Sequence, residues 1–133
     1  YLCARENRLY PSDLRTRFKA EQWMDWQQTS LNRASGAAFV QWIRTPQAQR
    51  NHDLIAQSVA ATEPLLNLLD QQLKTQSFIA GEQMSMADIP IACEVHRWWG
   101  LPQSRPSWPH LERWYAHMRQ LSGAAGVLDL TLS

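Results

Sequence analysis

The side chains that could do chemistry in this chain of 133 residues are few and widely spaced. Four histidines, His52, His96, His110 and His117, could in principle bind a metal ion or transfer protons. None of them stands in a metal-binding helix spacing such as HExxH, so the sequence predicts no metal site. His96 falls on an apolar helix face, a position more typical of a hydrogen-bonded core histidine than of a metal ligand.

The short motifs of nucleophilic and phosphate-binding sites are also missing. The sequence contains no GxSxG turn for a serine nucleophile and no glycine-rich loop that would hold a phosphate. Cys93 lies on the expected buried face of a helix, where a thiol packs rather than reacts. The chain's own motifs therefore assign no catalytic residue.

A serine and an aspartate three residues apart, Ser85 and Asp88, stand just before an apolar segment. The first N–H groups of a helix have no partner inside it. Ser85 as the N-cap can accept from the N–H of Asp88, and the Asp88 carboxylate can accept from the N–H of Ser85, which makes a capping box. Met84 and Ile89 could add the accompanying hydrophobic staple. The pattern predicts a structural role for Ser85 and Asp88.

The elements that must position any site are predicted to be helices throughout. No segment shows the period-two alternation of a strand, and the chain has only five glycines. One long helix is expected over residues 12–44, capped by Ser12 and bent at Ser35-Gly36. A second helix, residues 49–74, carries an apolar stripe, and Pro64 inside it is expected to kink it.

Two further helices and a tail complete the expected all-α bundle of about five helices. The third helix is expected to begin at Ser85 and to end at Gly100-Leu101-Pro102. The fourth is expected to be capped by Ser107, with Pro109 in its first turn. The apolar residues of the tail, within 127–130, are expected to pack back onto the bundle.

Composition excludes several classes of function. The 13 basic and 12 acidic residues leave a net charge of +1, so no basic face for nucleic acid is expected. No apolar run approaches the roughly 20 residues of a membrane span, and the opening residues YLCAR do not have the pattern expected of a signal peptide. Two cysteines, Cys3 and Cys93, make no disulfide framework, so a reducing, cytoplasmic location is expected. Seven tryptophans could fill a helical core, or some could line an apolar pocket.

Four stretches, in order, resemble glutathione transferases. FIAGEQMSMADIPIA, at residues 78–92, resembles the family segment F-x-x-G-x-x-x-S-x-A-D, in which a capping box starts the central buried helix of the C-terminal domain. YLCAR resembles the end of the last helix of the thioredoxin-like domain. AEQWMDWQQTSLNRA resembles the first long helix of the all-α domain in bacterial members, and RPSWPHLERWYAHM the late P-x-L-x-x-W helix. Together the four stretches cover nearly the whole chain.

The resemblance implies a division of the chain and a place in an enzyme. Residues 1–10 would be the remnant of the last thioredoxin-like helix and a linker, and residues 11–133 the C-terminal helical domain. That domain would supply the pocket for a small apolar electrophile and the interface of a homodimer. Glutathione would be the co-substrate, with no other cofactor, in bacterial detoxification. The catalytic residue would belong to the missing N-terminal domain, so residues 1–133 alone would be inactive.

The resemblance also suggests four substrate-binding residues. Asn32 and Arg33 align with a histidine and a lysine near the active site of beta-class members. Asparagine cannot titrate like histidine, so Asn32 is expected to hydrogen-bond, and Arg33 could instead be a solvated or dimer-face charge. Trp98 or Trp99 would match a tryptophan beside the electrophile pocket, with Trp98 preferred; plain packing is the alternative for both. On a helix the two point about 100° apart, so one can face the core and the other a neighbouring surface.

A second interpretation gives the same fold a different function. Helical domains of this kind also serve as non-catalytic interaction modules in translation factors, synthetases and a stress-associated protein. Those modules often carry extended charged surfaces for their partners, and this sequence shows none.

Overall fold

The computed structural model describes residues 2–6 and 8–133, and within them the chain is all-helical, as predicted. Its one β-type contact in that part of the chain is an isolated bridge between Phe78 and Gly81. None of the described helices is both long and apolar enough to cross a membrane. The α-helices are α1 Leu2–Glu6, α2 Leu14–Trp26, α3 Asn32–Phe39, α4 His52–Leu73, α5 Asp88–Trp99 and α6 Pro109–Gln120.

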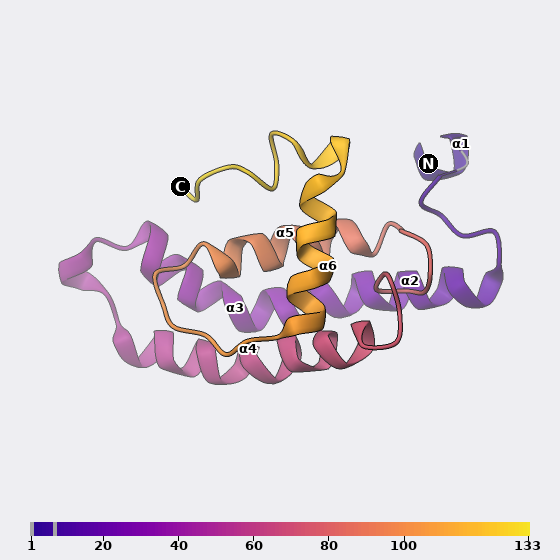
Figure 1. Ribbon diagram of the computed structural model, residues 1–133. Coiled ribbons are helices and arrows are strands. Elements are labelled where there is room, and N and C mark those ends of the chain that lie inside the picture. Colours follow the sequence, from indigo (N-terminus) through magenta and orange to yellow (C-terminus); the bar gives the residue numbers. More distant parts are fainter. Residues whose placement is uncertain (1, 7) are drawn as a thin grey trace.

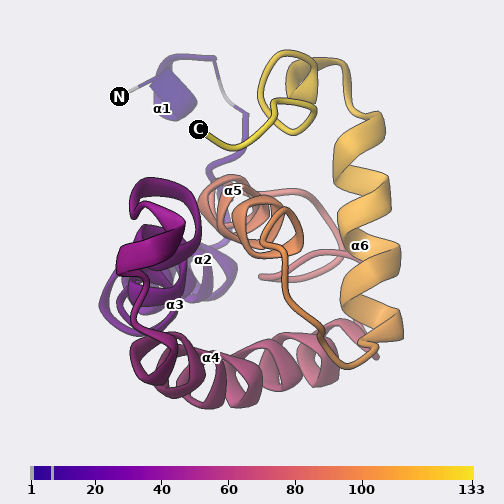
Figure 2. The same cartoon turned by 90° about the vertical axis from the view of Figure 1, so that its left-hand side faces the viewer.

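The helices surround α5. Figure 2 shows α2 and α3 on one side of α5, α4 below it and α6 on the other side. In Figure 1, α6 runs across the direction of the other long helices, and the chain's first helix and its C-terminal tail both lie above α5. The buried core contains residues from every long helix, including Ala20, Ala38, Leu69, Val95 and Trp114.

The single helix expected over residues 12–44 is interrupted by two π-helical turns, and not at Ser35-Gly36. A π turn, Gln27–Leu31, separates α2 from α3, and a second, Val40–Arg44, follows α3. In the first, the Thr29 hydroxyl donates to the carbonyl of Asp25 at 2.7 Å. Such a bond adds a competing donor to the helix carbonyl, but it does not by itself account for the break, because the same bond from Thr62 to Ser58 leaves α4 continuous.

The caps of α2 and α4 come from single side chains. Asp13, not Ser12, caps α2, and its carboxylate accepts from the N–H and hydroxyl of Thr16 at 2.8 and 2.7 Å. Asn51 caps α4 through its side-chain oxygen, so this helix begins three residues later than predicted. α4 then continues through Pro64 to Leu73.

The start of α5 depends on the carboxylate of Asp88, which is fully buried. One oxygen accepts from the N–H of Ser85 at 2.8 Å and from its hydroxyl at 3.2 Å. The other accepts from the N–H of Ile79 and the indole N–H of Trp114, both at 3.0 Å. Burial raises the pKa of the Asp88 carboxyl, and the donated hydrogen bonds offset part of that rise.

Around this carboxylate the local geometry differs from the predicted one. The helix begins at Asp88 itself, and the Ser85 hydroxyl accepts from the N–H of Ala87 at 3.3 Å, not from that of Asp88. The N–H of Asp88 donates to the Ser85 carbonyl at 3.1 Å instead. Met84 packs on the core, whereas Ile89 keeps 43% of its surface exposed, so it does not join the core as a staple partner.

A second buried aspartate caps α6 from another helix. Asp70, near the end of α4, accepts from the N–H groups of His110 and Leu111 at 2.8 and 3.0 Å. The predicted cap, Ser107, lies one residue too early, and its hydroxyl donates to the carboxylate of Glu112 at 3.3 Å. The N-terminus of α6 is therefore fixed to α4.

The two ends of the chain lie over the bundle. In the segment predicted to be a helix remnant and linker, Leu2–Glu6 form the short helix α1, and residues 1 and 7 lie outside the described residues. After it, the carbonyl of Leu9 accepts from the N–H of Met86 at 2.7 Å, which fastens the linker to the loop before α5. In the tail Leu128 is buried, as predicted, and Leu132 packs on the core, whereas Val127 and Leu130 are exposed.

We predict that Asp88→Asn lowers the free energy of unfolding by about 3 kcal/mol, because the amide offers one acceptor oxygen and turns its NH₂ toward two donors. Urea unfolding measures the change. Asp25→Asn, at an exposed position of α2, is the control and is expected to change little. An Asp88→Asn chain as stable as the parent would contradict the role given to this carboxylate.

Two glycine substitutions are expected to act in opposite directions. Gly36 lies inside α3, and an added Cβ would meet nothing within 4 Å, so Gly36→Ala should stabilise the chain by up to about 1 kcal/mol. Gly126 has φ +76°, a left-handed conformation that alanine adopts poorly, so Gly126→Ala should destabilise by a similar amount. Thermal unfolding measures the Tm of both variants, which should rise for Gly36→Ala and fall for Gly126→Ala. Tm shifts of the same sign in the two variants would contradict the prediction.

Candidate functional site

The four residues suggested for substrate binding fall in two places. Asn32 and Arg33 begin α3; the first is half-buried and the second exposed. Trp98 and Trp99 end α5, where Trp98 is 3% exposed and Trp99 is half-buried. Among the described residues, no hydrogen bond or ring contact joins either member of the first pair to either tryptophan.

Trp98 and Trp99 point in different directions, as expected for neighbours on a helix. Trp98 belongs to the hydrophobic core, and its buried indole N–H has no acceptor among the residues that the structure describes. Trp99 stands in an aromatic group on the other side, with ring centroids 5.9 Å from Trp108 and 6.0 Å from Tyr115. The guanidinium carbon of Arg105 lies 4.8 Å from the Trp99 ring centroid. Trp99 is therefore the tryptophan of this pair that faces a surface.

Beside Trp99 lies a cavity of about 370 Å³, between the helix ends and the C-terminal tail. A volume of this size suits a small organic molecule, and flat aromatic walls are typical of such sites. The tail contributes residues 128–132, and the lining residues from the bundle are Ile43, His96, Trp99, Gly100, Tyr115 and Arg119.

The tail is held over this cavity by His96. The Nε2 atom of His96 lies 2.8 Å from the carbonyl oxygen of Leu130, and its Nδ1 atom lies 2.7 Å from the hydroxyl of Tyr115. A carbonyl only accepts, so Nε2 carries the hydrogen, and in the neutral ring Nδ1 accepts from the tyrosine. Burial raises the pKa of Tyr115, which keeps its hydroxyl protonated for this bond.

The remaining reactive side chains near α5 do not form a catalytic group. Burial raises the pKa of the Cys93 thiol, with the Glu94 carboxylate adding to the rise, so the unreactive thiol form is favoured. Within the part of the chain that the structure describes, no three His, Cys, Asp or Glu side chains lie together in a way that could hold a metal ion.

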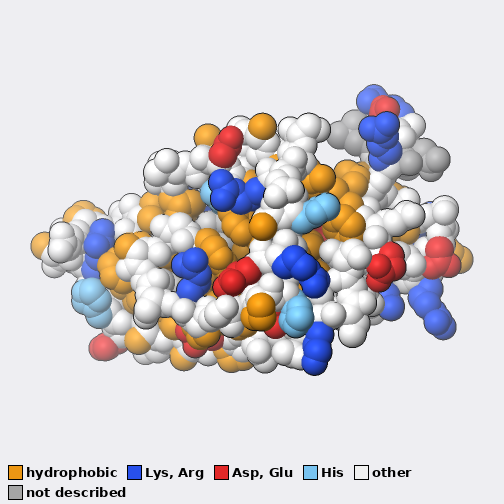
Figure 3. All heavy atoms as spheres, viewed as in Figure 1, with side chains coloured by type: hydrophobic (Ala, Val, Ile, Leu, Met, Phe, Trp, Pro, Cys, Tyr) orange, Lys and Arg blue, Asp and Glu red, His pale blue; other side chains and the backbone are white. Residues whose placement is uncertain are grey.

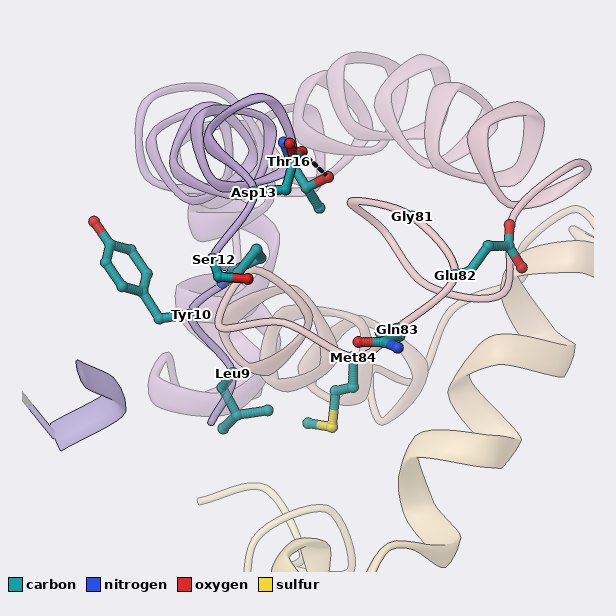
Figure 4. A pocket seen from close by; sticks show the side chains of 10 residues that line it. Leu9, Tyr10, Ser12, Asp13, Thr16, Gly81, Glu82, Gln83 and Met84 are labelled. Atoms are coloured by element: carbon teal, nitrogen blue, oxygen red, sulfur yellow. Dashed lines mark hydrogen bonds between the residues drawn. The ribbon is translucent and has the colours of Figure 1, made fainter. Parts of the chain in front are cut away.

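A second hollow, of about 560 Å³, lies where the linker meets the loop before α5. Figure 4 shows Leu9, Ser12 and Asp13 from the linker side and Gly81 to Met84 from the loop, with the Tyr10 side chain directed away. The Asp13 carboxylate is engaged by Thr16, and these hydrogen bonds lower its pKa. The other carboxylate that lines this hollow, Glu82, accepts from the Ser77 hydroxyl at 2.9 Å, so both carboxylates are hydrogen-bonded.

Sequence reasoning did not find most of the cavity beside Trp99. The sequence predicts a hydrogen-bonded His96 but not its partners, Tyr115 and Leu130, which lie 19 and 34 residues away along the chain. Arg119 carried no motif. The apolar residues of the tail are the feature of the sequence that indicates that this segment packs over the bundle and so borders the cavity.

Comparisons with known proteins identify the architecture. The family described as "Glutathione S-transferase, C-terminal domain" matches residues 33–121. The chain belongs to this family. Glutathione S-transferase GstB of Escherichia coli is 27% identical over 135 residues, covering all of this chain and 65% of that protein. The chain thus spans less than two thirds of the length of that family member.

Solved structures give the same result. The theta class glutathione S-transferase of Xanthomonas axonopodis pv. citri, with glutathione bound, superimposes with a TM-score of 0.95 at 31% identity. It is matched over all of this chain and 65% of its own. A shorter similarity, 35% identity over 54 residues and 38% of this chain, links the family domain to elongation factor 1-gamma of Rattus norvegicus, of which it covers 12%.

We predict that the hydrogen bond from His96 to the carbonyl of Leu130 holds the tail against the bundle. His96→Phe keeps a ring but loses both hydrogen bonds, so amide hydrogen exchange in residues 126–133 should become faster. Tyr115→Phe is the matched control, because it removes one bond and leaves the bond to Leu130. Equal exchange in both variants and the parent would show that apolar packing alone holds the tail.

Proposed function

We propose that this chain is the C-terminal domain of a glutathione transferase and forms the electrophile-binding wall of its active site. The observation that carries the proposal is the aromatic cavity beside Trp99 in a chain of this family. The glutathione bound to the Xanthomonas axonopodis relative supports glutathione as the co-substrate; no other cofactor is invoked.

The proposed reaction joins the sulfur of glutathione to an electrophilic carbon. The thiolate attacks that carbon and displaces its leaving group, or adds to it, and the reaction is faster when the thiol pKa is lowered by donors and positive charge. We assign the group that lowers it to the thioredoxin-like domain that the family resemblance implies. The residues of this chain would hold the electrophile against the rings of Trp99 and Tyr115, which contact each other, and exclude water beneath the tail.

The two residues at the start of α3 have weaker support. Asn32 is half-buried and keeps a side chain able to hydrogen-bond a substrate. Arg33 is exposed, which suits either a contact with glutathione or a dimer-face charge. Neither borders the cavity beside Trp99.

A homodimer is part of the proposal. Leu14 and Phe18 lie one turn apart on α2 and keep 61% and 59% of their surfaces exposed. Apolar side chains so exposed often mark an interface, and a second copy of the protein is the partner we propose. Bacterial detoxification in the cytoplasm remains part of the proposal on the sequence arguments, with the free thiols Cys3 and Cys93 consistent with a reducing compartment.

The rival function is a non-catalytic interaction domain. The similarity to elongation factor 1-gamma favours it, but over little more than a third of the chain. Figure 3 shows charges of both signs scattered over the viewed face, without the extended single-sign surface that such a module would use. Turnover of glutathione and an aromatic electrophile by the full-length protein separates the two functions, since an interaction module has none.

We predict that Trp99→Ala in the full-length enzyme raises the KM for a neutral aromatic electrophile several-fold, by loss of about 1 kcal/mol of aromatic contact. The KM for glutathione should change little. Trp98→Ala is the comparison: it should mainly lower stability, by about 3 kcal/mol or more, because that ring is in the core. If only Trp98→Ala changes the KM for the electrophile, the assignment of Trp99 to the electrophile-binding wall is wrong.

A further inference from the structure

A third cavity, of about 490 Å³, lies between the loop that follows α4 and one face of α6. The loop and α6 lie side by side in both Figure 1 and Figure 2. This α4–α6 cavity is lined by residues 74–78 and by Arg113, Trp114 and His117. Its volume is within the range of small-molecule sites.

The α4–α6 cavity is separate from the cavity beside Trp99, with which it shares no lining residue. Arg113 and His117 of α6 line the α4–α6 cavity, whereas Tyr115 and Arg119 line the other. Residues two positions apart on a helix point about 200° apart. The two cavities therefore lie on opposite faces of α6, and a ligand in one would not enter the other.

The charges around the α4–α6 cavity are mostly positive. Lys74, Arg113 and His117 line it, and none of the described residues in its lining is acidic. All three basic side chains are exposed, and no carboxylate of the described residues forms an ion pair with Lys74 or Arg113. One carboxylate, Glu82, stands next to the lining, where it accepts from the Ser77 hydroxyl at 2.9 Å. Two cations and a histidine against one carboxylate make this cavity a place where an anion is attracted.

Arg113 is held in position with donors left over. Its Nη2 atom donates to the carbonyl of Leu73 at 2.6 Å and to that of Gln76 at 3.4 Å. Its Nε and Nη1 atoms have no acceptor among the described residues. A guanidinium is a rigid, planar group, so fixing one nitrogen also fixes the direction of the others. The contacts with the end of α4 therefore orient the N–H groups that a ligand could use.

The loop side of the cavity is also fixed by hydrogen bonds. Phe78 and Gly81 exchange two backbone hydrogen bonds, of 2.9 and 3.3 Å. Between them, the carbonyl of Ile79 accepts from the side chain of Gln72 at 3.0 Å, and its N–H donates to Asp88. A binding surface that is already ordered loses little conformational freedom when a ligand arrives. The loop can therefore present its side chains to a small molecule without first folding around it.

We propose that the α4–α6 cavity binds a small phosphate monoester that carries an aromatic ring. A phosphate monoester has a charge of about −1.5 to −2 at neutral pH and three strong acceptor oxygens, which suit Lys74, Arg113 and the N–H of His117. The half-buried ring of Phe78 offers an apolar wall for the ligand's ring, with His117 edge-on to it at 5.5 Å between centroids. This site is additional to the proposed catalytic one and does not depend on it.

The test is a titration of the full-length protein with phenyl phosphate, followed by amide chemical shifts in the presence of saturating glutathione. Shifts are expected in residues 74–78 and 113–117. Lys74→Gln should raise the Kd about threefold, and Lys74→Gln combined with His117→Gln about tenfold, through loss of charge-assisted hydrogen bonds. Glu82→Gln should lower the Kd, because it removes the one neighbouring negative charge. Lys19→Gln, exposed on α2, removes the same charge elsewhere and should leave the Kd unchanged.

Two further compounds test the two halves of the ligand. Phenol lacks the phosphate and inorganic phosphate lacks the ring, so both should bind more weakly than phenyl phosphate. Binding of either as tightly as phenyl phosphate would overturn the proposed ligand class. Equal weakening by Lys19→Gln and Lys74→Gln would show attraction to net charge alone and overturn the site. Binding that shifts no amide of residues 74–78, or that glutathione displaces, would place the anion elsewhere and overturn it as well.

Discussion

The arrangement of α5 and α6 depends on the hydrogen bonds that the buried carboxylate of Asp88 accepts. Its donors come from three separate places in the chain: Ile79, Ser85 and Trp114. A buried acceptor of this kind is stable only when its donors are all in place, and each donor would be costly to leave unpaired. The loop before α5, the start of α5 and the middle of α6 must therefore come together in one arrangement.

Asp70 adds a second fixed point on α6. It holds the first N–H groups of that helix against α4, while Trp114, further along, is held against Asp88. Two points on one helix set its direction as well as its position, which accounts for the way α6 crosses the bundle. Tyr115 follows Trp114 directly, so the wall of the cavity beside Trp99 is positioned by the contacts that hold the fold.

The sequence was sufficient for the parts of the fold that depend on local pattern. The helical period, the break before α4 and the importance of Ser85 and Asp88 follow from residues within a few positions of one another. Asp70 as the cap of α6 could not be predicted in this way, since it lies 40 residues from His110. The same holds for the pairing of His96 with Tyr115 and of Ser35 with Glu94, which exist only after the helices have packed.

The π turn at Gln27–Leu31 governs the face that α3 presents. Such a turn holds one residue more than an α-helical turn, and one residue corresponds to about 100° of rotation. Loss of a single residue there would rotate Ser35 away from Glu94, whose carboxylate accepts from the Ser35 hydroxyl, and Phe39 away from Arg97, whose guanidinium carbon lies 4.1 Å from the Phe39 ring centroid. The spacing within this turn, and not only the identity of the residues after it, thus determines whether Ser35 and Phe39 of α3 meet their partners on α5.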